Sequence, residues 1–181
     1  MIQVRRGVFE SNSSSTHSIC IPKKCKNTIN HVYFSIGEYG WANDSVDPAS
    51  YLYTGILSAY NQEDAQKLID EIVEILVNND IDFNFEKPKY IRYICDGKEH
   101  FVVDHGYIDH GYELCPFIEA IVKDESMLLR YLSAGKVYTG SGTDPSGCDI
   151  AYEDIYDYNK DEYVPNPYHD EENYDYFYKG N

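Results

Sequence analysis

The chain has 181 residues, of which 43% are hydrophobic and 15% aromatic, and its formal net charge is −16. This is enough apolar side chain for one domain with a sizeable core, and the aromatic content argues against wholesale disorder. The acidic balance argues against direct binding to DNA or an anionic membrane, and no apolar run approaches the roughly 18 residues of a membrane helix. Because the N-terminus also lacks the apolar stretch of a signal peptide, we expect a cytoplasmic protein with reduced cysteines.

In the N-terminal half, two short runs of β-branched and aromatic residues, 16–21 and 31–36, predict strands. After the second of these strands, turn-forming residues predict a loop over 37–50, which contains the only tryptophan. Apolar residues then recur at three- and four-residue spacing over 62–79, which predicts a helix with Asn61 as its N-cap. The side chains expected on its buried face include Leu68, Ile72 and Leu76.

In the C-terminal half, the Asp96–Gly97 dipeptide predicts a hairpin between strands 90–95 and 100–103. A helical region is expected over 116–133, with an interruption near 124–126, and Gly135 is its expected C-cap. A last strand over 136–139 and a loop over 140–148 follow. Pro165 and Pro167 predict a flexible hinge beyond them.

These elements predict an α+β fold, with a mainly antiparallel sheet packed against two principal helices. The domain should span residues 1–148. An acidic, tyrosine-rich segment over 149–181 is either part of the same domain or a tail.

Charge is distributed unevenly along the chain. Residues 1–30 carry a net charge of +4, whereas residues 149–178 hold ten carboxylates and eight tyrosines against one lysine. Such a surface favours a positively charged protein groove as its partner. The residues expected to contact that partner are Asp149, Glu153, Asp154, Tyr156, Asp157, Tyr158, Asp161, Glu162, Asp170, Glu171, Glu172 and Asp175.

A hydroxyl-rich run near the N-terminus is the first candidate for chemistry. It includes Glu10, Asn12, Ser13, Ser14, Ser15 and His17. Short hydroxyl side chains bond to backbone amides, so a tight structural loop is the preferred interpretation. Phosphate binding near Arg5 and Arg6, or a serine nucleophile paired with the histidine, are the alternatives.

The second candidate is a repeat of Asp-His-Gly-Tyr at a period of five residues. Its side chains are of types that bind zinc or another divalent ion: Asp104, His105, Asp109 and His110, with Glu113 nearby. The spacing matches no known ligand signature and the glycines favour turns, so a charged turn is preferred. We therefore expect no metal ion and no cofactor.

Two weaker candidates follow the repeat. Cys115 would be a nucleophile if His105 or His110 activated it, but a cysteine that opens an apolar run is usually core filler. The glycine-rich segment 140–147 lacks the lysine and the following helix of a phosphate-binding loop, so an ordinary loop is expected.

Residues 5–18 resemble the N-terminal signature Gly-Val-Phe-Glu-Thr-Asn-Ser-Ser-Ser-Thr-His-Ser of many uncharacterised proteins of bacteriophages and of mobile elements in Firmicutes. Ser11 stands where that signature has threonine. The whole chain looks like a type II-A anti-CRISPR protein of this kind, a phage-borne inhibitor of the Cas9 nuclease. The resemblance implies an inhibitory binding protein in the bacterial host cell, which occupies the basic nucleic-acid-binding surface of Cas9 with its guide RNA.

Two other classes of function stay open. One is a small phage enzyme acting on a nucleotide or phosphorylated substrate through the serine-rich run and the Asp-His repeat. The other is a virion or assembly protein.

Overall fold

The computed structural model describes residues 17–37, 39, 45–95, 97–104, 115–141, 150 and 152–179. These residues fall into two compact units. The first unit draws on 30–40 and 49–123, and the second on 12–29, 41–48 and 124–181. Helices and mostly antiparallel strands occur together, so the predicted α+β fold class is confirmed.

Helix α2 (Gln62–Asn78) of the first unit forms as predicted. Its N-cap is Asn61, whose side-chain oxygen accepts a hydrogen bond from the Asp64 amide at 3.1 Å. The predicted buried face is confirmed, because Leu68, Ile72 and Leu76 are all buried. This face packs against α3 (Cys115–Val122) and against β4 (Asp82–Phe85).

Helix α1 (Pro48–Ala59) corrects the prediction of a loop over 37–50, because the helix begins inside that range. Strand β3 (Ser45–Val46) lies in the same range. Burial at consecutive positions Tyr51, Leu52 and Tyr53 leaves no apolar stripe on one face, so the helix carries no amphipathic period in its sequence.

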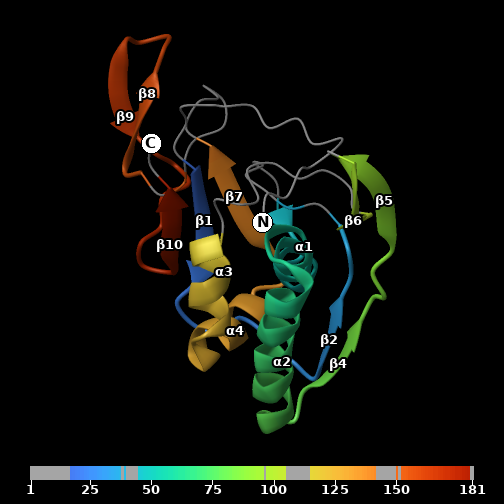
Figure 1. Cartoon of the computed structure of the whole chain (residues 1–181). Coiled ribbons are helices and arrows are strands. Elements are labelled where there is room, and N and C mark those ends of the chain that lie inside the picture. The colour runs from blue at the N-terminus through green and yellow to red at the C-terminus, as the bar shows by residue number, and fades with distance from the viewer. Residues whose placement is uncertain are drawn as a thin grey trace. The chain divides into compact units, whose positions relative to one another are not determined.

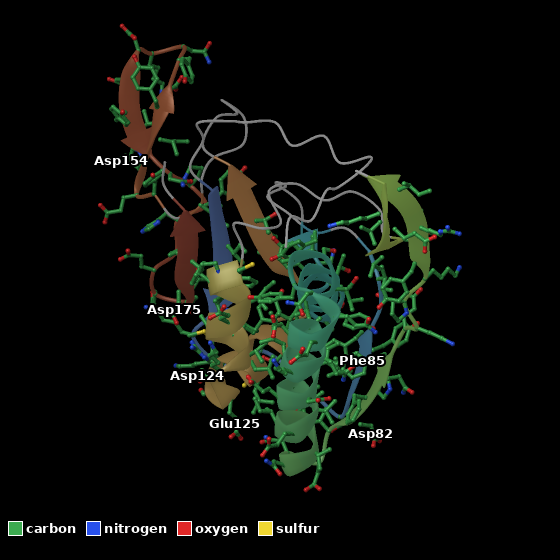
Figure 2. The ribbon with its side chains drawn as sticks, in the orientation of Figure 1. Asp82, Phe85, Asp124, Glu125, Asp154 and Asp175 are labelled. Atoms are coloured by element: carbon green, nitrogen blue, oxygen red, sulfur yellow. The ribbon has the colours of Figure 1, made fainter. Side chains whose placement is uncertain are left out.

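Two pairs of strands belong to the first unit. Strand β2 (His31–Phe34) pairs in parallel with β4, which is an exception to the mainly antiparallel pairing. The pair places Phe34 beside Phe85, which is labelled in Figure 2, with ring centroids 4.4 Å apart. Strands β5 (Tyr90–Cys95) and β6 (Lys98–Val103) form the predicted hairpin, in which Gly97 has a φ of 71°.

The predicted interruption of the second helical region is confirmed. Helix α3 ends at Val122, and α4 (Glu125–Leu132) begins two residues after Lys123. Asp124 is the N-cap of α4, because its side chain accepts a hydrogen bond from the Met127 amide at 2.9 Å. The cap side chain thus starts a new helix at the predicted break. The C-cap of α4 is Ser133, and the predicted Gly135 lies two residues further on, at a φ of 72°.

The second unit contains an antiparallel sheet in the order β10-β1-β7-β3, of which Figure 1 labels β10, β1 and β7. Strand β1 (His17–Pro22) pairs on one side with β7 (Val137–Ser141). On its other side it pairs over its whole length with β10 (Tyr174–Lys179). Helix α4 packs against β1, which buries Ile19 and Ile21. The last described residues of the acidic segment, Tyr174–Lys179, are therefore a strand of this sheet.

A second piece of the acidic segment is an antiparallel hairpin of β8 (Asp154–Asp157) and β9 (Glu162–Pro165). Between β9 and β10, Asn166 replaces the predicted hinge with a hydrogen-bonded turn. Its amide donates to the Glu153 carbonyl at 2.6 Å, and its side-chain amide donates to the Tyr152 carbonyl at 2.9 Å. The turn between the two prolines is thus tied to the start of β8.

Tyr53 makes the stability of the first unit sensitive to alkaline pH. Its hydroxyl donates to the Glu86 carbonyl at 3.0 Å, and burial, followed by nearby Tyr90 and Glu86, raises its pKa to about 12. The unfolded chain releases this proton near pH 10 and the folded chain retains it, so stability should fall as pH rises from 10 to 12. The stability difference between the parent and Tyr53→Phe, measured by urea unfolding, should shrink by about 1–2 kcal/mol over this range. An unchanged difference would contradict the assignment.

Candidate functional site

The β8–β9 hairpin presents a cluster of three tyrosines, Tyr156, Tyr158 and Tyr163, which we call the tyrosine cluster. Tyr156 lies opposite Tyr163 in the register, and their ring centroids are 5.2 Å apart in an edge-to-face arrangement. Tyr158 packs edge-on against Tyr156 at 5.0 Å. The side chains of Tyr158 and Tyr163 are 67% and 72% exposed, so this aromatic cluster faces solvent. Exposed clusters of large aromatic side chains mark interaction surfaces.

Two of the predicted carboxylates hold the turn of this hairpin in place. The Asp157 side chain accepts a hydrogen bond from the Asn159 amide at 2.9 Å, and this bond, assisted by Lys160, holds the pKa of the Asp157 carboxyl below its usual range. Asp161 has a φ of 57°, in the left-handed region, and its carboxylate accepts a hydrogen bond from the Tyr156 hydroxyl. That bond raises the pKa of Tyr156. The turn is therefore fixed by acidic side chains that sequence inspection assigned to a partner.

Other predicted carboxylates are exposed and make no side-chain hydrogen bond or ion pair with the described residues. They are Asp154, labelled on β8 in Figure 2, Glu162 on β9, and Glu172 in the loop before β10. Asp154 lies two residues before Tyr156 and on the same face of the hairpin, whereas Glu162 is opposite Asp157 in the register and lies on the other face. The hairpin thus combines exposed aromatic area with two carboxylates, Asp154 and Glu162, that make no ion pair with the described residues, whereas Lys160 pairs with Asp157.

Asp175 on β10 is exposed, but an ion pair ties it to other elements of the second unit. Its carboxylate accepts a hydrogen bond from Arg130 of α4 at 2.9 Å. The same guanidinium nitrogen donates to the Pro22 carbonyl of β1 at 3.1 Å. Arg130 is 18% exposed, so this carboxylate stabilises the packing of α4 on the sheet.

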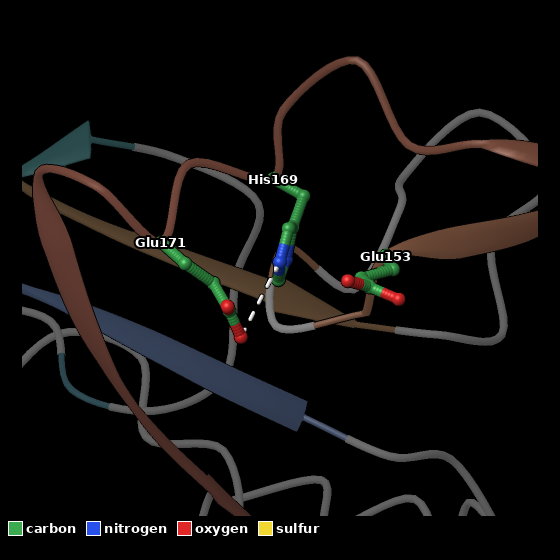
Figure 3. Close-up of side chains that lie close together, drawn as sticks. All are labelled: Glu153, His169 and Glu171. Atoms are coloured by element: carbon green, nitrogen blue, oxygen red, sulfur yellow. Dashed lines mark ion pairs between the residues drawn. The ribbon is translucent and has the colours of Figure 1, made fainter.

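The side chains of Glu153, His169 and Glu171 converge between the start of β8 and the loop before β10 (Figure 3). One ligand atom from each lies within 4.8 Å of the other two. The Nε2 atom of His169 is 3.5 Å from Glu171 Oε1 and is buried without a hydrogen-bond partner. This is the only group of His, Cys, Asp and Glu side chains with metal-binding geometry in the described part of the chain.

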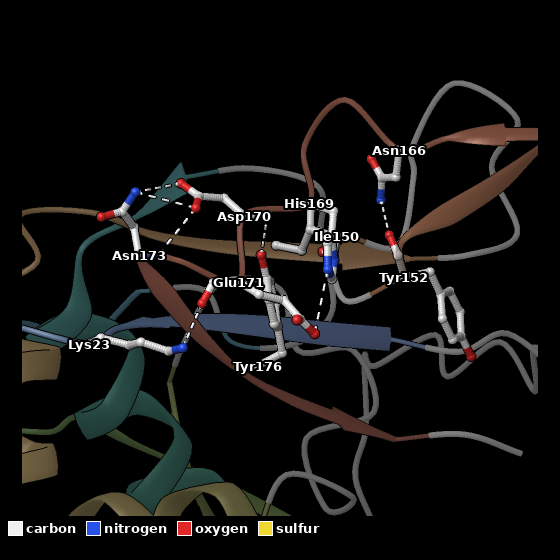
Figure 4. A network of polar contacts seen from close by, with 9 residues as sticks. All are labelled: Lys23, Ile150, Tyr152, Asn166, His169, Asp170, Glu171, Asn173 and Tyr176. Atoms are coloured by element: carbon white, nitrogen blue, oxygen red, sulfur yellow. Dashed lines mark hydrogen bonds and ion pairs between the residues drawn. The ribbon is translucent and has the colours of Figure 1, made fainter.

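A network of polar contacts holds the loop that carries this group (Figure 4). The Asp170 amide donates to the Tyr176 hydroxyl at 2.6 Å, and the Asp170 carboxylate accepts from the Asn173 amide at 3.1 Å. Lys23 donates to the Glu171 carbonyl at 2.5 Å. Loop 169–173 is thus attached both to β10 and to the residue that follows β1.

Several predicted residues lie outside the described residues. They are Asp149, the hydroxyl-rich run through Thr16 with Glu10, Asn12, Ser13, Ser14 and Ser15, and the repeat members His105, Asp109, His110 and Glu113. His17 is the first residue of β1. The predicted loop 140–148 begins in β7, and its remainder also lies outside.

Cys115 is half-buried at the first position of α3. Its carbonyl accepts a hydrogen bond from the Tyr60 hydroxyl at 3.1 Å. Burial, followed by the nearby Cys115 and Glu119, raises the pKa of Tyr60 above its ordinary value. A position that accepts a hydrogen bond from a half-buried tyrosine fits a structural role for this cysteine.

Sequence inspection missed His169 and Tyr163. His169 is the only histidine among residues 149–181, which was an available signal. Its proximity to Glu153 depends on the chain reversal between β8 and β9, which the sequence pattern did not predict. Tyr163 was one of eight tyrosines in the segment, and only the strand register distinguishes it.

Comparisons of the chain with protein-family models, with curated proteins and with solved structures give no significant match. Among the helices described, none combines the length and apolar character needed to cross a membrane.

Proposed function

We propose that this protein is an inhibitory binding protein that uses the β8–β9 hairpin to occupy a basic nucleic-acid-binding surface of another protein. The observation that carries this proposal is the exposed tyrosine cluster on a hairpin that also bears exposed carboxylates. Tyr158 and Tyr163 are more than half exposed, and Asp154 and Glu162 on the same hairpin have no internal cation among the described residues. An aromatic surface combined with unpaired negative charge is suited to a partner rich in lysine and arginine.

Physical chemistry supports this role in two ways. Carboxylates can pair with the guanidinium and ammonium groups that otherwise bind phosphates. Tyrosines supply flat contact area at a low cost in side-chain entropy. Because the hairpin turn is held by Asp157 and Asp161, little ordering remains to oppose association.

The narrower proposal concerns the partner and rests on the resemblance of residues 5–18 to the phage signature. We propose an RNA-guided nuclease of the Cas9 type in the bacterial cytoplasm, which holds nucleic acid in a positively charged channel and reads its adjacent motif with arginines. Inhibition by occupancy of that channel requires no catalytic residue. It also requires no direct contact between this protein and DNA.

Binding to Cas9 with and without guide RNA is the direct test. We expect a complex whose dissociation constant rises steeply between 0.05 and about 0.5 M salt, because exposed charges interact over a Debye length of only about 10 Å at 0.1 M. Tyr163→Ala should weaken binding about tenfold or more. Tyr90→Ala, which removes a tyrosine 49% exposed on β5, is the matched control and should leave affinity unchanged. A dissociation constant that changes neither with salt nor in Tyr163→Ala would contradict the proposed surface.

A further inference from the structure

We propose that Glu153, His169 and Glu171 bind one divalent transition-metal ion of the zinc class. This inference is independent of the proposed inhibitory function. It departs from the expectation of no metal, which considered only the Asp-His repeat. Carboxylate and imidazole ligands together suit first-row divalent ions, and three protein ligands leave a coordination position for water.

The histidine ring is oriented as a metal ligand requires. Its Nδ1 atom lies 3.4 Å from the Ile150 carbonyl, which can only accept, so this contact favours a proton on Nδ1. In the neutral ring Nε2 then carries the lone pair, and Nε2 is the atom that lies 3.5 Å from Glu171 Oε1. Metal-bound histidines commonly have their second nitrogen held in this way by a carbonyl.

Among the described residues, the Nε2 atom has no hydrogen-bond partner, and its contact with Glu171 Oε1 is 3.5 Å long. It is buried and belongs to a side chain only 12% exposed. A buried polar atom left without a partner costs free energy, which a metal–nitrogen bond would offset. The ring is further held by stacking on Tyr176, with centroids 5.3 Å apart and planes 9° from parallel. The nitrogen is therefore presented in a fixed direction.

The spacing of the donor atoms fits a small ion. Two ligands at about 2.0–2.2 Å from a tetrahedral zinc ion lie about 3.4 Å apart. Nε2 of His169 and Oε1 of Glu171 are already 3.5 Å apart. Glu153 is exposed, so a change of side-chain rotamer can bring its carboxylate the remaining distance. The bound ion would join the start of β8 to loop 169–173.

Zinc binding to the full-length protein tests the proposal. Isothermal titration with zinc chloride should give one site per chain, and Glu153→Gln and His169→Ala should each weaken it at least about tenfold. Glu153→Gln is the more informative variant, because its side chain is exposed and the change preserves shape. Glu172→Gln, one residue from Glu171 and also exposed, is the matched control and should bind as the parent does.

Three further measurements distinguish this site from other metal-binding residues of the chain. Zinc should raise the melting temperature of the parent but not of Glu153→Gln. A His105→Ala/His110→Ala variant should still bind one ion. Cobalt in place of zinc should give visible absorption that disappears in His169→Ala. Absence of stoichiometric binding, or binding that survives both Glu153→Gln and His169→Ala, would overturn the proposal and leave an ion pair between His169 and Glu171.

Discussion

Replacement of Phe34 with alanine is expected to lower the free energy of unfolding by about 3–5 kcal/mol, because the lost ring leaves a cavity in the core of the first unit. The side chain is completely buried. Its ring stacks on Phe85 with planes 13° apart, and meets Tyr53 edge-on at 6.2 Å. Urea unfolding followed by circular dichroism, compared with the parent, measures this loss.

Tyr33→Ala provides the matched control on the same strand. Tyr33 precedes Phe34 in β2, points to the opposite face and is 54% exposed. Its replacement should cost less than about 1 kcal/mol, since surface substitutions rarely cost more. Similar losses for the two variants would show that the aromatic packing around Phe34 does not stabilise the first unit.

Local signals in the sequence account for the elements that were predicted. Helix α2 has a clear apolar period and Asn61 as a cap, and the β5–β6 hairpin has its turn dipeptide. Each of these signals acts over a few residues, so no knowledge of distant parts of the chain is needed. The break at Asp124 belongs to the same group, because a capping side chain acts on its own helix.

Elements that depend on distant contacts were missed. Helix α1 is buried around several sides by other elements, which removes the amphipathic period. Strand β4 has only four residues, and two helices separate it in the sequence from β2, its pairing partner. The pairing of β10 with β1 joins opposite ends of the described chain, and no local pattern specifies such a partner.

The sequence predicted that carboxylates and tyrosines make up the candidate site. It did not predict which of the carboxylates stabilise turns and which are exposed to a partner. The sequence presents ten similar carboxylates between Asp149 and Tyr178. Their backbone surroundings differ, however. Asp157 and Asp170 accept hydrogen bonds from backbone amides in tight turns, whereas the side chains of Asp154 and Glu162 make no hydrogen bond or ion pair among the described residues. Only the strand register and turn geometry separate these two kinds of acid.

That division determines how the proposed binding surface should be tested. Lysine at Asp157 or Asp161 would disrupt the hairpin turn itself, and Asp161 in addition has a left-handed backbone. A variant with lysine at Asp154, Glu162 and Glu172 avoids both problems, because these side chains are exposed. Loss of binding in this variant would then report on charge, provided that circular dichroism shows unchanged folding.

The triple lysine variant should associate with the nuclease about 10²–10³ times more slowly at low salt, while its dissociation rate changes less, because exposed charges mainly steer the encounter. The nuclease should then bind its DNA in the presence of the variant. Stopped-flow or surface-based kinetics measure the first effect, and a DNA-binding assay the second. The matched control places lysine at three exposed acids of the first unit, Glu71, Glu74 and Asp82. Both variants change the net charge by the same amount. Equal slowing of association in the two variants would therefore assign the effect to overall charge. Slowing that is confined to the first variant would assign it to the hairpin and the loop that follows.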